Sequence, residues 1–349
     1  MMRILVATDA WHPQVNGVVR SLEATIAELR ALGVEVEMIT PQGFRSVALP
    51  TYPGIRLALA GRRALSARLA ALRPDHVHIA TEGPIGLAAR AACLREGRPF
   101  TTSYHTQFPD YLAARLPVPR DLVYAALRWF HNAGCGTMVA TESLTEDLGK
   151  RGFRRLMRWS RGVDATLFHP RAASILDLPR PIFLYVGRVA VEKNVEALLE
   201  LDLPGSTVIV GDGPARAGLQ ARYPKAHFLG NRTGELLART YASADVFVFP
   251  SRTDTFGIVL LEALASGLPV AAYPVPGPKD VIATSGAGVL DADLFTACHA
   301  ALKIPNACAR AHALRFTWRE SARQFLDNVT TARSGHDGVT CRNAQAFAR

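Results

Sequence analysis

The side chains best suited to chemistry lie in a loop and helix near residue 255. The loop 251–257 follows an apolar strand and ends in Phe256-Gly257, before an apolar helix that begins Ile258-Val259. A glycine there allows the backbone amides at the helix N-terminus to approach an anion closely. Asp254 lies in the loop, and Glu262 lies about two turns further along, roughly 10 Å away. The two carboxylates could bind sugar hydroxyls on either side of a diphosphate, or Asp254 could only cap the helix while Glu262 is solvated.

A second charged loop follows another predicted strand, at residues 187–194. It contains Arg188 and Lys193, and the carboxyl edge of a parallel sheet is where α/β proteins bind ligands. Two cations in this position suit a diphosphate leaving group, whose negative charge grows as the sugar bond breaks. A solvated surface loop is the alternative interpretation.

The N-terminal half offers three further candidates at strand ends. His105 follows the run Phe100–Tyr104, the loop after the first strand contains Asn16 and Gly17, and Glu82 lies in the turn Thr81–Gly86. We expect all of them at one edge of one sheet. His105 is either catalytic or structural on this evidence, and the glycines either admit a ligand or only make tight turns.

The order of the predicted elements indicates an α/β protein. Short apolar runs alternate with helical patterns along most of the chain, which is typical of βαβ units and parallel sheets. The predicted strands are 3–8, 34–40, 76–79, 100–104, 137–140, 181–186, 206–210, 246–249 and 269–273.

An irregular, proline-bounded segment near residue 170 predicts a boundary between two domains. We expect an N-terminal domain over 1–170 and a second domain over 171–310. A C-terminal helix over 311–329 is expected to pack back on the N-terminal domain, and 330–349 to form a flexible tail.

Composition excludes several classes of protein. The 349 residues are 49% hydrophobic and 20% charged, which suits two buried cores. Neither a signal peptide nor a membrane-spanning run is visible, and the five cysteines form no C-x-x-C pair, which favours a cytoplasmic protein without structural zinc. The net charge of +10 comes without a nucleic-acid-binding motif, so we expect no nucleic-acid partner.

Taken together, the motifs resemble those of glycosyltransferase family 4 over nearly the whole chain, to about residue 329. Within the family the chain is similar to bacterial mannosyl- and glycolipid-forming members. The family normally has glutamate where this chain has Asp254. The motifs that carry the resemblance are Asn16–Val19, the strand end at His105, Trp159–Asp164, Gly187–Asn194, Gly211–Pro214, Tyr241–Ser251 and the pair Asp254 and Glu262.

The resemblance implies the GT-B fold: two Rossmann-like α/β domains whose parallel sheets face each other across a cleft. It implies that 1–170 is the acceptor-side domain and 171–310 the nucleotide-sugar-binding domain. It implies a retaining, metal-independent enzyme with no cofactor beyond its nucleoside-diphosphate sugar. Arg188, Lys193, Gly17 and the amides from Phe256 through Gly257 and Ile258 to Val259 would hold the diphosphate. Asp254 would bind the donor sugar and Glu262 the ribose. His105 would bind the transferred sugar or position the acceptor, with Asn16 and Glu82 nearby.

The basic excess suggests an anionic membrane surface. The stretch 150–161 holds six cations and no acid, with Phe153 and Trp159 between them, and arginines recur over 62–73. Such patterns suit peripheral binding at the inner face of the cell membrane, although an ordinary arginine-rich surface is the alternative.

The predicted reaction moves a hexose or hexuronosyl unit to a lipid such as diacylglycerol or phosphatidylinositol. The donor would be of the GDP-mannose, UDP-glucose or UDP-glucuronate type. Two rivals stay open: a GT-B-like sugar-nucleotide epimerase, and a non-catalytic sugar-nucleotide-binding partner of a membrane enzyme. No G-x-G-x-x-G fingerprint supports a nucleotide-dependent oxidoreductase.

Overall fold

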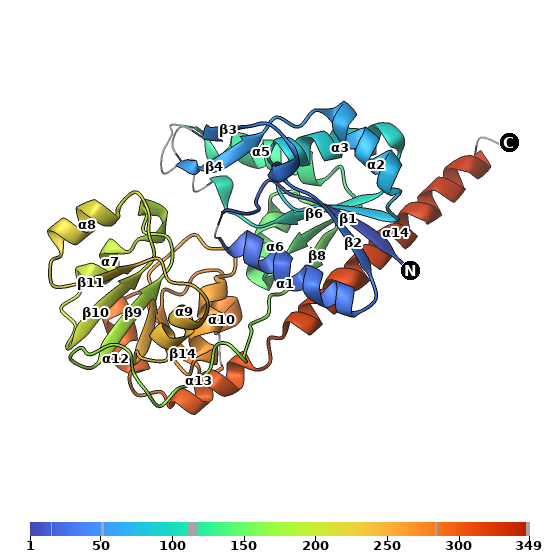
Figure 1. Ribbon diagram of the computed structural model, residues 1–349. Coiled ribbons are helices and arrows are strands. Elements are labelled where there is room, and N and C mark those ends of the chain that lie inside the picture. Colours follow the sequence, from blue (N-terminus) through green and yellow to red (C-terminus); the bar gives the residue numbers. More distant parts are fainter. Residues whose placement is uncertain (15, 50–51, 110–117, 283–284, 347–349) are drawn as a thin grey trace. The chain divides into compact units, whose positions relative to one another are not determined.

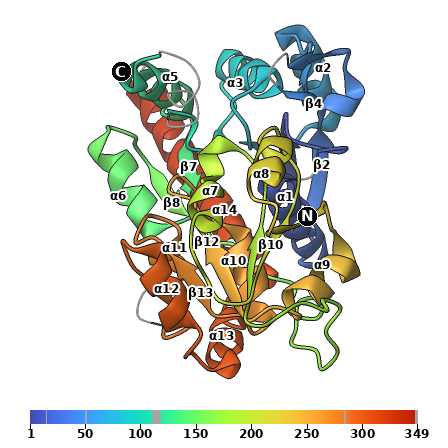
Figure 2. The same cartoon turned by 90° about the vertical axis from the view of Figure 1, so that its left-hand side faces the viewer.

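The computed structural model describes residues 1–14, 16–49, 52–109, 118–282 and 285–346, and it divides into two compact units. Unit 1 comprises Met1–Pro109, Val118–Ser160 and the C-terminal segment from Trp318, whereas Arg161–Thr317 belongs to unit 2 (Figures 1 and 2). Each unit is built on its own six-stranded sheet. None of the helices in the described part of the chain is long and apolar enough to cross a membrane.

The sheet of unit 1 has the strand order β2-β1-β5-β6-β7-β8, and every adjacent pair is parallel. The strand order reverses between β1 and β5. The carboxyl ends of these two strands therefore flank a topological switch point. The strands are β1 (Arg3–Ala7), β2 (Glu35–Ile39), β5 (His76–Ile79), β6 (Phe100–Tyr104), β7 (Gly136–Val139) and β8 (Leu156–Arg158).

Successive side chains of β1 point to opposite faces of the sheet, and both faces are apolar, so helices cover both. Leu5 and Ala7 pack with α2 (Arg62–Leu72), α3 (Pro84–Glu96) and α5 (Arg120–His131). Ile4 and Val6 point the other way, toward α1 (Gly17–Ala31) and α14 (Trp318–Ala346), which lie side by side in Figure 1. The remaining elements of the unit are the antiparallel pair β3 (Ser46–Leu49) and β4 (Tyr52–Ala58), the 3-10 turn η1 (Pro41–Gly43) and α6 (Glu142–Lys150).

Helix α14 completes the core of unit 1. Phe325 is buried and stacks edge-on against Trp159 at 5.1 Å, and Trp159 Nε1 donates to Ser321 Oγ at 3.1 Å. The helix continues to Ala346, so most of the segment 330–349 is helical where the sequence analysis expects a tail. Of this segment, residues 347–349 lie outside the described residues. This extension is rich in Gly, Thr, Ser, Asp and Asn, which have low helix propensity, so the sequence gives no sign of a helix there.

Unit 2 has the strand order β11-β10-β9-β12-β13-β14, again parallel throughout. This is the strand order of a dinucleotide-binding Rossmann sheet, with its switch point between β9 and β12. The strands are β9 (Ile182–Val186), β10 (Ser206–Val210), β11 (His227–Gly230), β12 (Val246–Phe249), β13 (Val270–Ala272) and β14 (Gly288–Leu290).

Helices cover both faces of the second sheet as well. Phe183, Val248 and Ala271 pack with α7 (Glu196–Leu199), α8 (Arg216–Arg222) and α12 (Leu294–Ala301), the last of which lies beside β13 in Figure 2. Phe247 faces the opposite layer, where it contacts Tyr241 at the end of α9 (Gly234–Tyr241). The further helices are η2 (Val191–Lys193), α10 (Ile258–Ala265), α11 (Pro278–Val281) and α13 (Asn306–Ala313).

The basic stretch 150–161 differs from its expected role as a free membrane-binding segment. Leu156–Arg158 forms the edge strand β8, and Phe153 and Trp159 are 4% and 0% exposed. Neither aromatic side chain is therefore available to a lipid headgroup. Phe153 and Trp159 flank this edge strand, and each packs into a core cluster of unit 1.

We expect Phe325→Ala to lower the free energy of unfolding of unit 1 by about 3–5 kcal/mol, because it removes a buried aromatic ring and leaves a cavity. Trp11, Trp129, Trp159 and Trp318 all lie in this unit, so tryptophan fluorescence in a urea titration reports on it selectively. Arg323→Ala, an exposed change on the same helix, is the control and should stay within about 0.5 kcal/mol of wild type. Equal stability of the two variants would show that α14 is not part of the core.

Candidate active site

The two charged loops of unit 2 lie at its switch point, one after β9 and one after β12. Lys193 forms an ion pair with Asp254, and both side chains are largely buried. Asn194 Nδ2 donates to the carbonyl of Pro250 at 3.1 Å, and Thr253 Oγ1 donates to the carbonyl of Glu192 at 3.2 Å. Three independent contacts therefore fix the loops against each other, as a ligand site at a switch point requires.

Two glycines let a third loop approach the segment that carries Arg188. A Cβ on Gly211 would lie 1.9 Å from the carbonyl oxygen of Gly187, and one on Gly213 would lie 2.3 Å from that of Val189. The hydroxyl of Tyr185 donates to the carbonyl of Arg188 at 2.7 Å. These contacts fix the backbone of Arg188 from two sides and so fix the position from which its half-buried side chain extends.

Gly257 places the first amides of α10 at the same edge. Its φ of +82° is left-handed, and a Cβ would lie 3.0 Å from the Phe249 ring, so only glycine fits without strain. Gly257 itself is the N-cap residue and has no capping side chain. Asp254 therefore does not cap this helix. The N-terminal amides of α10, from Ile258 and Val259 onward, have no partner within the helix and carry its positive dipole end.

Glu262 is buried, with 3% of its surface exposed, and the hydroxyl of Tyr241 donates to its Oε2 at 3.0 Å. The solvated alternative for this residue is thereby excluded. Sequence patterns gave no sign that Tyr241 supports Glu262, because the two residues lie on different helices, α9 and α10.

Two polar atoms in the β12–α10 loop stay unsatisfied within the described protein. Ser251 is fully buried and its Oγ has no hydrogen-bond partner there, and the same holds for Oδ2 of Asp254. Buried oxygens without a donor are costly. A ligand hydroxyl at Asp254 would remove that cost, and Ser251 is a residue that the sequence analysis did not single out.

In unit 1, Asn16 and Gly17 begin helix α1. The side-chain oxygen of Asn16 accepts from the amides of Val18 and Val19, both at 3.0 Å. Asn16 thus acts as an N-cap, which is a structural role for its oxygen. Gly17 is the first residue of the helix, and its amide lies at the positive end of the helix dipole.

His105 directly follows β6, at the edge where the sequence analysis expects it. Its ring lies 5.6 Å from the indole of Trp159 in an edge-on arrangement, and the side chain is half-buried. The imidazole is therefore supported by the core cluster that α14 completes.

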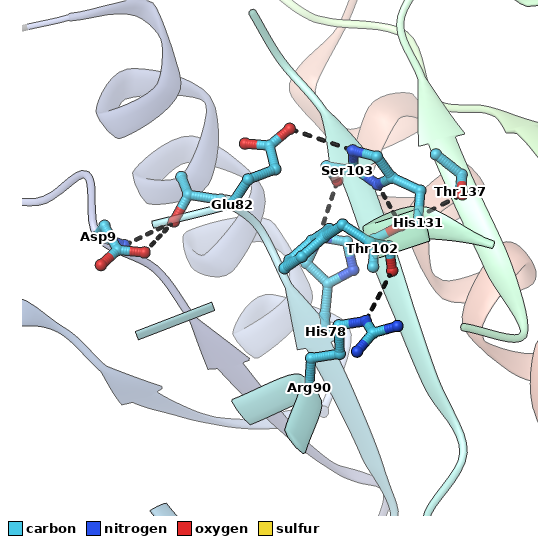
Figure 3. Close-up of polar contacts among 10 residues, drawn as sticks. Asp9, His78, Glu82, Arg90, Thr102, Ser103, His131 and Thr137 are labelled. Atoms are coloured by element: carbon cyan, nitrogen blue, oxygen red, sulfur yellow. Dashed lines mark hydrogen bonds and ion pairs between the residues drawn. The ribbon is translucent and has the colours of Figure 1, made fainter. Parts of the chain in front are cut away.

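Asp9 and Glu82 flank the switch point of unit 1, after β1 and β5 (Figure 3). Asp9 was missed by the sequence analysis, although an aspartate directly after a buried strand is a usable signal. Its Oδ1 accepts from the amide of Ile85 at 2.8 Å, and Oδ2 accepts from Thr81 Oγ1 at 2.9 Å and the amide of Gly86 at 3.2 Å. Burial raises the pKa of the Asp9 carboxyl, these hydrogen bonds oppose the rise, and the nearby charge of Glu82 adds to it.

The predicted residues therefore fall into two sets. Arg188, Lys193, Asp254, Glu262 and the 256–259 amides share the switch-point edge of unit 2, whereas Asn16, Gly17, Glu82 and His105 belong to unit 1. The unit 2 edge presents cations and helix amides, which suits a diphosphate. No group of three or more potential metal ligands occurs among the described side chains.

The comparisons with known proteins agree with this geometry. Residues 15–167 match the model of Glycosyltransferase Family 4, and residues 180–303 match the model of Glycosyl transferases group 1. The chain belongs to glycosyltransferase family 4, and it is a glycosyltransferase of the GT-B fold that uses a nucleotide-activated sugar.

Two relatives and one solved structure illustrate the similarity. A GDP-mannose-dependent alpha-mannosyltransferase of Mycobacterium tuberculosis (strain CDC 1551 / Oshkosh) is 35% identical over 316 residues, covering 83% of each chain. A GDP-mannose-dependent alpha-(1-6)-phosphatidylinositol dimannoside mannosyltransferase of Mycobacterium tuberculosis (strain ATCC 25177 / H37Ra) is 27% identical over 93% of this chain and 95% of its own. Sucrose-phosphate synthase from Thermosynechococcus elongatus shares the fold, with a TM-score of 0.75 at 21% identity over 94% of this chain and 98% of that one.

We expect Arg188→Ala and Lys193→Ala each to lower kcat/KM for the donor about a hundredfold, equivalent to about 2.7 kcal/mol, because each removes a cation from a developing diphosphate charge. Steady-state kinetics with thermal unfolding as a folding check measures this. Lys303→Ala, an exposed lysine elsewhere in unit 2, is the control.

Lys193 also pairs with Asp254, so a purely structural role needs a separate test. The double variant Lys193→Ala/Asp254→Asn removes the carboxylate charge that the single variant leaves unpaired. We expect it to stay as slow as Lys193→Ala. Recovery to the wild-type rate would show that Lys193 only neutralises Asp254.

Proposed function

We propose that this protein transfers a hexose, with retention of anomeric configuration, from a nucleoside-diphosphate sugar to a membrane lipid. GDP-mannose is the first donor to test, since two relatives are named as dependent on it; UDP-glucose and UDP-glucuronate are the others. The observation that carries the proposal is the meeting of Arg188, Lys193 and the N-terminus of α10 at the switch point of unit 2.

Each donor group has a candidate partner at this edge. Arg188, Lys193 and the amides of residues 256–259 would hold the diphosphate. Glu262 would bind the ribose hydroxyls, and its hydrogen bond from Tyr241 keeps its carboxylate in a fixed orientation. Asp254 would bind hydroxyls of the transferred sugar through Oδ2, the oxygen that Lys193 does not use.

The proposed reaction is a front-side displacement. The bond between the anomeric carbon and the leaving phosphate oxygen breaks, and a bond to the acceptor hydroxyl oxygen forms on the same face. The acceptor proton passes to the leaving phosphate, and His105 would bind the transferred sugar or position the acceptor. Arg188 and Lys193 stabilise the charge that accumulates on the diphosphate, which is the role that a metal has in other transferases.

The acceptor proposal depends on a surface of unit 1 other than the stretch 150–161. Helices α3 and α5 expose Leu87, Leu94, Leu122 and Trp129, at 44%, 48%, 64% and 58% of their surface. Arg90 joins the two helices, because its guanidinium stacks 3.7 Å from the Trp129 ring centre. We name these four exposed residues the α3–α5 face.

The charges near this face suit an anionic membrane. Exposed arginines on the same or neighbouring helices include Arg62, Arg63 and Arg95, and α2 contacts α3 through a hydrogen bond from Arg95 to Ser66. Arg68, by contrast, packs over the Phe44 ring. Each basic side chain near an anionic bilayer contributes about 1 kcal/mol, and exposed Leu and Trp can enter the headgroup region.

A lipid acceptor is consistent with this arrangement. Helix α3 begins directly after the turn that holds Glu82, so the α3–α5 face starts close to the proposed acceptor edge. One relative is named for phosphatidylinositol dimannoside. Phosphatidylinositol and diacylglycerol are therefore the acceptors to test, at the inner face of the cell membrane.

We expect the purified protein to transfer sugar from one member of a panel of GDP-mannose, UDP-glucose and UDP-glucuronate to phosphatidylinositol or diacylglycerol in vesicles. Turnover should persist in excess EDTA, because cations and helix amides meet the diphosphate charge. Radiolabelled donor and lipid extraction measure the product. Loss of activity in EDTA that Mg²⁺ or Mn²⁺ restores would contradict metal independence, and release of a rearranged free sugar nucleotide would identify an epimerase.

We expect the protein to co-sediment with vesicles that contain an anionic lipid and to dissociate as salt rises toward 1 M, where the Debye length falls to about 3 Å. Leu122→Ser/Trp129→Ser should abolish most of this binding. The matched control is Leu236→Ser/Leu314→Ser, which changes two residues of unit 2 that are 50% and 49% exposed. Equal binding by the two double variants would exclude the α3–α5 face as the membrane-contacting surface.

A further inference from the structure

Glu82, in the turn between β5 and α3, contacts a histidine from helix α5. Its Oε1 lies 3.1 Å from Nε2 of His131, the last residue of α5, and the two side chains are 11% and 0% exposed. Glu82 follows β5, one of the two strands that flank the switch point of unit 1. A carboxylate at the ligand-binding edge of the sheet is thus bound to a fully buried imidazole.

The second ring nitrogen of His131 is held equally well. Nδ1 lies 2.8 Å from Thr102 Oγ1, and Thr102 Oγ1 lies 3.2 Å from Thr137 Oγ1. Both threonines are fully buried, on the adjacent strands β6 and β7. Figure 3 shows the resulting chain of contacts from Glu82 through His131 to Thr102 and Thr137.

Aromatic packing prevents the ring from turning. The imidazole lies 5.1 Å from the Phe130 ring, 5.7 Å from Tyr104 and 5.9 Å from Phe153. With both nitrogens bonded and both ring faces enclosed, Nε2 points in one direction only. That direction fixes where the Glu82 carboxylate lies.

A buried polar network of this kind is energetically less favourable than apolar packing of the same volume. Removing a histidine and a carboxylate from water carries a desolvation penalty. Apolar side chains of similar size often stabilise a fold more for this reason. His76, on strand β5 of the same unit, is a buried histidine without a carboxylate partner. It contacts Thr101 Oγ1 at 2.9 Å, and burial lowers its pKa to about 3.

We propose that His131 is a positioning residue that orients Glu82 to bind the acceptor hydroxyl. This inference rests on the proposed transferase function and specifies its acceptor site. One carboxylate oxygen of Glu82 is occupied by His131, and the other points away from His131 in Figure 3. That second oxygen accepts the hydrogen bond from the hydroxyl of the acceptor. Supporting partners of this kind contribute on the order of 10–100-fold to activity.

Two amide variants separate the two hydrogen bonds of His131. The side-chain amide of glutamine reaches the position of Nε2, whereas that of asparagine reaches only the position of Nδ1. His131→Gln therefore keeps a donor for Glu82, and His131→Asn keeps only the contact to Thr102. We expect His131→Asn to raise KM for phosphatidylinositol or diacylglycerol in vesicles at least about tenfold, and His131→Gln to recover most of that loss.

Comparing the KM values of the two substrates distinguishes a positioning role of His131 from a general loss of structure. The rise should appear in KM for the lipid and not in KM for the nucleotide sugar. His76→Gln, which alters a buried histidine without a carboxylate partner, should keep the lipid KM of wild type. If His131→Asn and His131→Gln lose activity equally, or if both substrates are affected alike, the positioning role is wrong.

A second measurement needs no turnover. In protein labelled with ¹⁵N-histidine, Glu82→Gln should shift the Nε2 resonance of His131, and titration with myo-inositol or glycerol should shift it in wild type only. No response to either polyol would overturn the proposal. Absence of transfer in the donor panel, with this response intact, would instead contradict the proposed function and leave the polyol site standing.

Discussion

Parallel pairing of every strand within each six-stranded sheet is the constraint on which the rest of this structure depends. All carboxyl ends of one sheet meet at one edge, and the reversal of strand order opens a space between two neighbouring loops there. In unit 1 that space is flanked by Asp9 and Glu82, and in unit 2 by the loops of Arg188 and Asp254. Residues far apart in the chain thus converge without any local signal.

The two edges differ in charge, and each charge is stabilised in its own way. Lys193 is paired with Asp254, Glu82 with His131, and Asp9 with the amides at the start of α3. Partners of this kind reduce the penalty for removing a charge from water. The unit 2 edge is therefore suited to a phosphorylated donor, and the unit 1 edge to an acceptor that presents hydroxyl groups.

Sequence patterns predicted the sheets well where strands are buried on both faces. The runs at 76–79, 206–210 and 246–249 coincide with β5, β10 and β12. Each is four or five residues long and rich in β-branched or aromatic residues, which favours a strand over a helix. The edge strands β8, β11 and β14 were missed. β8 lies within the basic stretch 150–161, so Phe153 and Trp159 on either side of the strand were assigned to a membrane and not to the core.

The sequence by itself determined the fold class, the family and the strand-end positions of Arg188, Lys193, Asp254 and His105, because local spacing and composition encode them. Only the tertiary structure decided which partner holds each charge. Tyr241 reaches Glu262 across 21 residues, and His131 reaches Glu82 across 49. These pairs form because helices pack on a sheet at fixed distances, and that packing depends on the whole core and not on any one segment.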